Sequence, residues 1–328
     1  SNLSWKVNAR QFLGDKKGAV RASVSTGFRA PSLHQIYLSN VQTLVSGGTV
    51  SNQGTFNNVS DVIRGLGVPA LDAETSFNIT AGFTYKIANN FSFSIDYYNI
   101  AVDDRVLFTG EIGFDGDDSS TNPVERILID NDVTSIKYFV NALDTRTQGL
   151  DIVLDYRNAP VGNNFLDFIL SVNFNETEIE NDAITSPGVV GEVGYEIFNR
   201  KEQSRITTAR PNFKALLGIN FKADKFRASL NNTYFGEVTW QHATDPERDQ
   251  TFGGKLVTDL IVGYQIIDRL GVDITVNNLF NVYPDVIDPK GDPVTDLGGR
   301  FQYPWEVNQF GFLGTVVNLG VTYQLGCN

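Results

Sequence analysis

The sequence predicts an all-β protein, an antiparallel transmembrane β-barrel, and three observations support this fold class. Stretches in which apolar and polar residues alternate recur along the 328 residues, which is the pattern of strands with two different faces. Each stretch is close to the ~9 to 11 residues that a tilted strand needs to cross a bilayer. The connections alternate strictly between short and long, as in outer-membrane barrels with periplasmic turns and extracellular loops.

The period-two pattern defines about eleven strands. In the second of them Val20 and Phe28 lie on an apolar face, whereas Arg21 and Arg29 lie on the polar face. The same division recurs along the chain, so one face of the sheet is expected to meet lipid and the other a polar lumen. The stretches are 4–12, 20–29, 77–86, 91–98, 150–157, 164–178, 213–222, 225–240, 256–267, 271–281 and 316–325.

The connections fall into two classes at opposite ends of the predicted sheet. Five short ones are expected to be periplasmic turns, at 14–18, 88–90, 158–164, 223–225 and 267–269. Five long ones are expected to be extracellular loops, at 31–74, 106–147, 179–211, 241–255 and 282–313. No domain boundary is evident, so residues 1–328 are interpreted as one sheet.

The placement of aromatic residues favours a membrane barrel over a soluble all-β protein, which is the alternative. Aromatics at strand ends are typical of the girdles at the two membrane interfaces. A soluble sandwich also buries one face of its sheet, but its core aromatics would be spread more evenly. The residues at or near predicted strand ends are Phe91, Tyr97, Tyr156, Phe174, Tyr234, Tyr264 and Tyr323.

Composition excludes several classes of protein. No run approaches the roughly 18 to 20 apolar residues of a membrane helix. A net charge of -12 argues against nucleic acid as a partner. The single Cys327 cannot form an intramolecular disulfide. Because the chain has no Met and no signal peptide, we expect a processed or truncated piece.

Catalytic and metal-binding motifs are not found. The two histidines, His34 and His242, lie in predicted loops, and neither a G-x-S-x-G nor an H-E-x-x-H motif is present. The acidic run DGDD at 115–118 does not have the ligand spacing of an EF-hand and is interpreted as a solvated turn. We therefore predict no enzyme activity, no cofactor and no metal site.

Aromatic residues of the last two long loops are candidates for ligand binding. Aromatic faces beside a cation suit a flat, partly anionic chelate through stacking and cation–π contacts. The alternative is that these side chains pack loop against loop. The candidates are Arg300, Phe301, Tyr303 and Trp305 in the last loop and Trp240 and His242 at the preceding one.

Arg29 is predicted to form a structural ion pair at the outer rim of the barrel. It shares the polar register with Asp72 and Glu74 across the neighbouring strand. Pairing with one of these carboxylates would fix the corner where the strand enters the first long loop, which Pro31 opens by keeping Ala30 extended.

Four short motifs fall at the ends of predicted strands in a defined order. They are GFRAPSL at 27–33 with Tyr37, LDAETS at 71–76, NA at 141–142 followed by TQGLD at 147–151, and NNLFN at 277–281 with Tyr283. By these motifs the chain, from about residue 4 to 325, resembles the C-terminal half of the barrel of a TonB-dependent outer-membrane receptor, an energised transporter of ferric siderophores, cobalamin and similar scarce ligands.

The resemblance implies a barrel of about 22 strands with a plugged lumen. It implies that the plug and the N-terminal barrel strands lie outside residues 1–328. It also implies a bacterial outer-membrane location, contact with outer-membrane lipid, a small chelate as ligand, and a TonB-type energy-coupling protein as partner through the missing N-terminal part. Uptake of a ferric siderophore or similar chelate is the leading interpretation; a glycan or cobalamin importer and a surface adhesin that binds a macromolecule are the alternatives.

Overall fold

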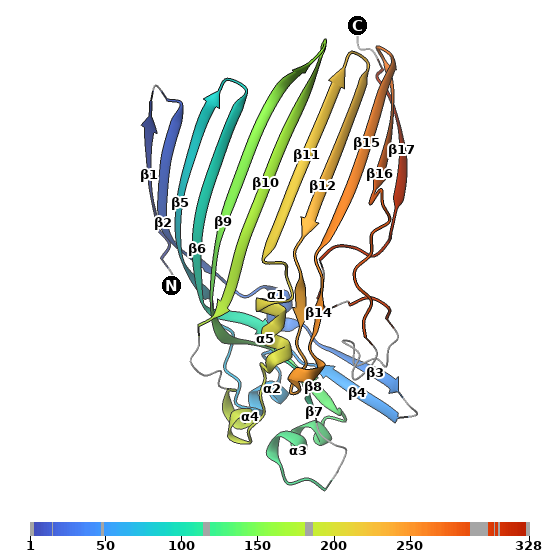
Figure 1. Ribbon diagram of the computed structural model, residues 1–328. Coiled ribbons are helices and arrows are strands. Elements are labelled where there is room, and N and C mark those ends of the chain that lie inside the picture. Colours follow the sequence, from blue (N-terminus) through green and yellow to red (C-terminus); the bar gives the residue numbers. More distant parts are fainter. Residues whose placement is uncertain are drawn as a thin grey trace.

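A single antiparallel sheet of eleven strands dominates the structure, a computed structural model (Figure 1). It describes residues 3–14, 16–46, 49–113, 119–180, 186–288, 301–304, 306–307 and 309–325. The sheet strands are β1 (Lys6–Leu13), β2 (Gly18–Arg29), β5 (Glu74–Ala88), β6 (Phe91–Phe108), β9 (Phe139–Val161), β10 (Asn164–Ile179), β11 (Phe213–Ala223), β12 (Phe226–Phe235), β15 (Lys255–Ile267), β16 (Leu270–Asn277) and β17 (Val316–Tyr323). The predicted fold class and strand number are confirmed.

Each sheet strand pairs with the next sheet strand along the chain, so the sheet is an up-and-down meander. Its two outer strands are β1 and β17, and the sheet does not close into a complete barrel. Short turns join the strands at one end, and the long connections gather at the other, at the bottom of Figure 1. The predicted alternation of short and long connections is therefore confirmed.

The long connections contain regular structure of their own. Two small sheets form there, one with strand order β3-β4-β8-β7 and one that pairs β13 with β14. The small strands are β3 (Asn40–Ser46), β4 (Thr49–Thr55), β7 (Ile112–Gly113), β8 (Ser135–Lys137), β13 (Val238–Trp240) and β14 (Gln250–Phe252). The helices are α1 (Leu33–Tyr37), α2 (Asp61–Gly65), α3 (Pro123–Asp130), α4 (Gly188–Glu192), α5 (Arg200–Thr207) and the 3₁₀ helix η1 (Pro246–Arg248).

Local sequence explains where most of these short helices begin. Ser32 caps α1 in a capping box with Gln35, directly after Pro31. Ser60 caps α2, and Asn122 caps α3 ahead of a proline in the first turn. In each case a side-chain oxygen accepts a hydrogen bond from a backbone N–H that has no partner within the helix.

The hairpin of β6 and β9 is longer than the sequence predicted. The two strands have 18 and 23 residues, and Val106–Phe108 still pair with residues 139–141. The connection between the two strands is therefore shorter than the predicted loop of 106–147, since it begins after Phe108 and ends before Phe139. Conversely, the stretch 225–240, predicted as one strand, ends at Phe235 in the main sheet, and β13 belongs to a separate sheet.

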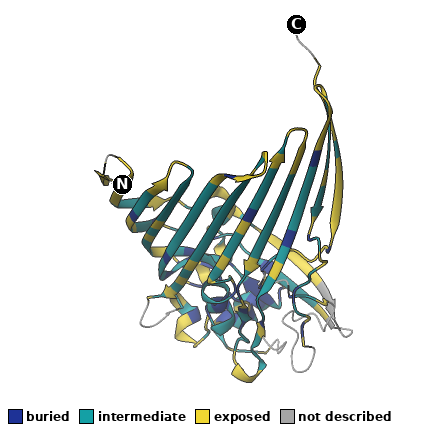
Figure 2. Cartoon of the chain, turned by 45° about the horizontal axis from the view of Figure 1, so that its top comes forward, coloured by how far each residue is buried: buried dark blue, intermediate teal, exposed yellow. Residues whose placement is uncertain are grey.

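The tightly packed core lies among the long connections, where buried residues gather in Figure 2. Its larger cluster draws on α2, α3, α4 and the extended ends of β6 and β9, with Ile63, Leu128 and Leu143 fully buried. A smaller cluster contains Trp240 and Phe252. Most sheet side chains are instead half-buried or exposed, as expected for a single layer.

Ion pairs cross the polar face of the sheet above glycines. Arg21 lies opposite Gly82, and Gly82 lies opposite Asp96, so the three positions form a row across β2, β5 and β6. The Nε of Arg21 donates to Oδ1 of Asp96 over 2.9 Å. A Cβ at position 82 would lie 2.0 Å from that oxygen, so only glycine leaves the space for the pair. Arg227, Gly263 and Asp273 repeat the arrangement on β12, β15 and β16.

We expect Leu128→Ala to destabilise the folded loops and to leave the sheet intact. Removing a fully buried leucine side chain costs about 2–5 kcal/mol, and the loop core includes sheet residues only at the loop ends of β6, β9 and β10. Limited proteolysis of whole cells measures loop opening, and heat-modifiable migration in gels measures the folded barrel. Leu33→Ala, at a side chain 75% exposed on α1, is the matched control. Equal loss of the folded barrel and of protease resistance in Leu128→Ala would contradict the separation.

Candidate ligand-binding cavity

The structure brings Arg29 and Glu74 into contact at the loop end of the sheet. Arg29 lies opposite Glu74 in the register of β2 and β5. Its Nε donates to Oε2 of Glu74 over 2.7 Å and its Nη2 to Oε1 over 2.5 Å. Glu74 also accepts the backbone N–H of Val106 over 2.8 Å, so one carboxylate joins β2, β5 and β6. Asp72 accepts instead from the backbone of Ala73, within the corner itself.

Trp240 and His242 are used to pack and order the loops. Trp240 is 1% exposed and belongs to the smaller core cluster, and its Nε1 donates to Oε2 of Glu306 over 2.6 Å. The Nδ1 of His242 accepts backbone N–H groups of Thr244 and Asp245. Trp240 therefore fits the alternative to ligand binding, in which the side chain packs loop against loop, because no ring face is left open to a ligand.

The aromatic candidates of the last long connection divide into separate environments. Tyr303 stacks between Tyr283 and Phe312, with ring centroids 5.7 and 6.0 Å apart. Phe301 is exposed. Arg300 and Trp305 lie outside the described residues, as do the acidic run 115–118 and Cys327.

A cavity of about 510 Å³ lies between α5 and the polar face of β6, β9 and β10, at the loop end of the sheet. Its lining contains three arginines, Arg105, Arg205 and Arg210, and one carboxylate, Glu202. The lining therefore carries an excess of two formal positive charges, in a chain whose net charge is -12. Its other members are Leu107, Phe108, Thr147, Asn175, Thr177, Phe198, Ile206 and Thr207.

The sheet wall of the cavity depends on a bulge in β6. The pairing register of β6 with β9 shifts between Val102 and Arg105, and Asp104 adopts a φ of 54°. Aspartate tolerates this left-handed conformation better than most residues, and Asp144 accepts its N–H over 2.9 Å. After the bulge, Nη1 of Arg105 donates to the hydroxyl of Thr145 over 3.3 Å, which holds its guanidinium over the polar face.

The other wall is α5, whose first turn is fixed by Asn199. Its side-chain oxygen accepts the N–H groups of Lys201 and Glu202, as an N-cap residue does. Residues three apart share a helix face, and Nη1 of Arg205 donates to Oε2 of Glu202 over 2.6 Å. Burial lowers the pKa of Arg205, but the charges of Glu202 and Glu306 raise it by more, so the net shift is upward.

The cavity has the chemistry of an anion site with apolar walls. Guanidinium groups offer forked donors that match carboxylate, phosphate and catecholate oxygens. Phe108, Phe198 and Leu107 supply apolar contact beside them. The described residues include no group of three or more His, Cys, Asp or Glu placed to hold a metal ion. The arrangement is therefore suited to an anionic ligand with an apolar or aromatic part.

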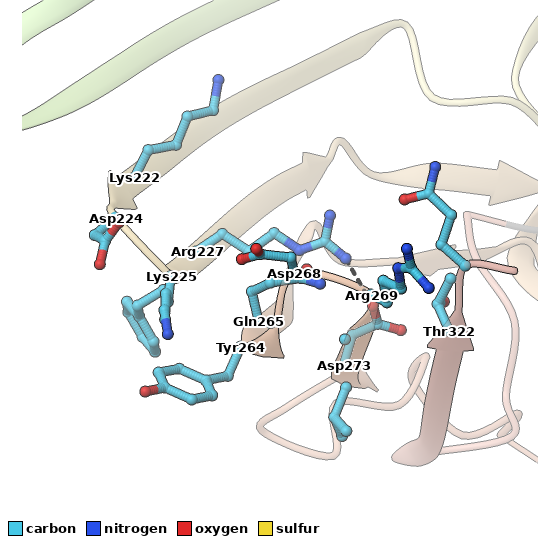
Figure 3. Close-up of a pocket in the computed structure, with 15 residues that line it drawn as sticks. Lys222, Asp224, Lys225, Arg227, Tyr264, Gln265, Asp268, Arg269, Asp273 and Thr322 are labelled. Carbon is cyan, nitrogen blue, oxygen red and sulfur yellow. Dashed lines mark hydrogen bonds and ion pairs between the residues drawn. The ribbon is translucent and has the colours of Figure 1, made fainter. Parts of the chain in front are cut away.

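A second cavity, of similar volume, lies at the short-turn end of β11, β12, β15, β16 and β17 (Figure 3). Its charged lining contains four cations, Lys222, Lys225, Arg227 and Arg269, and three carboxylates, Asp224, Asp268 and Asp273. Arg227 already donates to Asp273 over 2.6 Å. Because cations and carboxylates are nearly equal in number here, this end has less attraction for an anion than the loop-end cavity.

The sequence interpretation did not identify the three cavity arginines or Glu306. One signal was available, since Arg200, Lys201, Arg205 and Arg210 fall within eleven residues of a strongly acidic chain. Their convergence with Arg105 depends on the pairing of β6, β9 and β10 and on the position of α5. Among the described residues, no helix combines the length and apolar character needed to cross a membrane.

Arg200 and Asp249 anchor the connection between β13 and β14. Nη2 of Arg200 donates to Oδ2 of Asp249 over 2.7 Å, and the N–H of His242 donates to Oδ1 over 2.8 Å. Burial raises the pKa of Asp249, but the hydrogen bonds from Arg200 and His242 lower it more, so the pKa lies below its usual value.

Comparison with known proteins gives one family and one fold. The family model described as "TonB dependent receptor-like, beta-barrel" matches residues 1–279. None of the curated proteins compared with the chain matches it. Similar solved structures include a mutant of the ferric enterobactin receptor PfeA from Pseudomonas aeruginosa, with 13% identity and a TM-score of 0.61 over 98% of this chain and 40% of that one.

Two further structures have the same fold. The copper transporter OprC has 13% identity and a TM-score of 0.59 over 98% of this chain and 39% of its own. The siderophore receptor PirA from Acinetobacter baumannii has 14% identity and a TM-score of 0.57 over 98% of this chain and 41% of its own. The chain therefore spans about two fifths of the length of these structures.

We expect the stabilising effect of Asp249 to disappear in acid. Because its folded-state pKa is lowered, the carboxylate stabilises the loop fully above the ordinary aspartate pKa of about 3.9 and loses this effect as the pH falls through the lowered folded-state pKa. Asp249→Asn should lower the free energy of unfolding by about 1–2 kcal/mol at pH 7 and by less near pH 3. Urea unfolding followed by tryptophan fluorescence, to which the buried Trp240 contributes, measures the difference; an equal difference at both pH values would contradict it.

Proposed function

Because the chain belongs to the TonB-dependent receptor-like family of β-barrels, we propose that it is part of an outer-membrane receptor for energised uptake of a scarce, anionic ligand. A ferric siderophore or similar chelate is the proposed ligand class. The energy would come from a TonB-type coupling protein, acting through parts of the receptor other than residues 1–328. Family membership supports transport and the outer-membrane location, since the family consists of transport receptors.

The loop-end cavity is the observation that carries the ligand proposal. It combines three arginines with aromatic and aliphatic walls, and it lies where the long connections meet the polar face of the sheet. A ligand arriving from the loop side would reach it before the rest of the polar face. Positive charge concentrated in a cleft of an otherwise acidic protein attracts anions selectively.

PfeA is named as a receptor for ferric enterobactin, and another similar structure is the ferripyoverdine receptor of Pseudomonas aeruginosa with ferripyoverdine bound. These names support a ferric chelate as the first class to test. The copper transporter among the similar structures shows that the fold alone does not decide the ligand. The arginine lining, in contrast, is a property of this chain.

A strain that lacks the receptor is expected to grow poorly under iron limitation when an anionic ferric chelate is the iron source. Growth under cobalamin limitation and on a limiting glycan should be unchanged. The comparison uses the parent strain, the deletion strain and the deletion strain that carries the full-length receptor. A defect confined to cobalamin or glycan limitation would overturn the chelate proposal and leave the family assignment intact.

Replacing Arg105 or Arg210 by Ala is expected to weaken uptake of the anionic chelate. Hydrogen bonds to charged groups contribute about 1.5–3 kcal/mol each, which corresponds to roughly a 10-fold or greater rise in the half-saturating concentration. Uptake of ⁵⁵Fe supplied as ferric enterobactin measures it. Arg126→Ala is the matched control, because Arg126 lies on α3, pairs with Asp130 and does not line the cavity. Equal effects of all three replacements would rule out a specific role for the cavity.

A further inference from the structure

The connection between β16 and β17 places a carboxylate in the protein interior. Glu306 has a side chain 2% exposed and receives three donors. Its Oε1 contacts Nη2 of Arg205 and lies 3.4 Å from Nζ of Lys201, and its Oε2 accepts the indole N–H of Trp240 over 2.6 Å. A buried carboxylate without such partners would carry a large desolvation cost. Glu306 is thus the ionic attachment of this connection to α5 and β13.

Arg205 belongs to this attachment and to the cavity at the same time. One terminal nitrogen donates to Glu202 and the other to Glu306, and the side chain also lines the cavity. Among the described residues, the cations Lys201 and Arg205 contact the carboxylates Glu202 and Glu306. An anion in the cavity adds negative charge beside these carboxylates, and it meets a guanidinium whose terminal nitrogens already have carboxylate partners.

Other contacts of the same connection avoid the cavity. Nε2 of Gln309 donates to the backbone oxygens of Gly236 and Gly253 over 2.5 and 3.0 Å. Asp285 pairs with Lys255 and accepts the N–H of Gly253 over 2.7 Å. The hydrogen bond from Lys255 lowers the pKa of Asp285. None of these residues lines the cavity. Glu306 differs from them, because its partner Arg205 is also a residue of the cavity lining.

We propose that Glu306 is a ligand-responsive latch, through which occupation of the arginine cavity by an anion loosens the connection between β16 and β17. The anion and Glu306 compete for Arg205, because both are bound by the same guanidinium. Lys201, Trp240 and Gln309 keep the connection near its site, so the expected change is a loosening and not a release. This inference rests on the proposed function of the cavity as an anion site.

Competition of this kind has a reciprocal consequence. If the anion weakens the latch, then removal of the latch must strengthen binding of the anion by the same factor. Glu306→Gln keeps the shape of the side chain and removes its charge. It should therefore loosen the connection and tighten anion binding together, by roughly 5-fold or more. A purely structural Glu306 predicts the opposite, since a damaged loop would bind its ligand less well.

The test uses the purified full-length receptor and citrate as a multivalent anionic probe. Isothermal titration gives the Kd for citrate, and hydrogen exchange of the peptide containing Glu306 and Val307 reports on the connection with and without citrate. In the unmutated receptor citrate should speed exchange of this peptide. In Glu306→Gln exchange should already be fast, should respond little to citrate, and the Kd should fall.

Asp285→Asn is the matched control. It weakens the other ionic contact of the same connection, with Lys255, without touching Arg205 or the cavity lining. Exchange of the connection should rise, and the Kd for citrate should stay unchanged. Heat-modifiable migration verifies that each variant retains a folded barrel.

The outcomes separate the latch from the proposed function. Weaker citrate binding by Glu306→Gln, with Arg105→Ala and Arg210→Ala also weakened, would overturn the latch and leave the cavity as an anion site. Unchanged exchange in Glu306→Gln would overturn it as well. Failure of the unmutated receptor to bind citrate or ferric enterobactin would overturn the proposed anion site and the latch with it. A tighter Kd for Glu306→Gln beside an unchanged Kd for Asp285→Asn supports the latch.

Discussion

Backbone hydrogen bonding between neighbouring strands is the constraint on which the rest of the structure depends. A sheet that crosses a bilayer must pair its N–H and C=O groups within the protein, because lipid offers no partners. The nine strands between β1 and β17 meet this requirement on both edges in the simplest order, because each pairs with the sheet strands before and after it along the chain. An up-and-down order sends alternate connections to opposite ends. All long segments are thereby collected at one end, where they can form a core together.

The cavity follows from that collection. The sheet alone buries little, and its polar face carries ion pairs such as Arg21–Asp96 that need the space above a glycine. At the loop end of the sheet α5 packs on β10, and the polar face of β6, β9 and β10 becomes one wall of the cavity. The bulge at Asp104 then places Arg105 on the same side as Arg205. A bulge in one strand is thus what brings the arginines of the cavity lining to the same side of the sheet.

The sequence predicted those features that depend on neighbours one or two residues away or directly across a strand pair. Period-two alternation located the eleven strands, and shared register placed Arg29 opposite Glu74. The structure within the loops was harder to predict from the sequence, because helices of five residues such as α1 and α2 are too short to show a clear helical period. Trp240 in a loop looks the same in sequence whether it faces a ligand or a core. The cavity arginines come together through the pairing of β6, β9 and β10 and the packing of α5 on β10, which no local pattern encodes.

The charge distribution of the cavity is easier to explain by selectivity than by stability. Burying Glu306 and Glu202 against Lys201 and Arg205 gains little over apolar packing, because the cost of removing charges from water offsets their attraction. An apolar cluster could hold the connection more simply, as Val307 and Ile287 do beside it. What an apolar cluster cannot do is respond to the charge of a neighbouring ligand. A shared guanidinium can respond, since any anion that binds Arg205 must weaken the interaction of Arg205 with Glu306. The buried ionic cluster thus gives the loops a means to respond to an anion in the cavity.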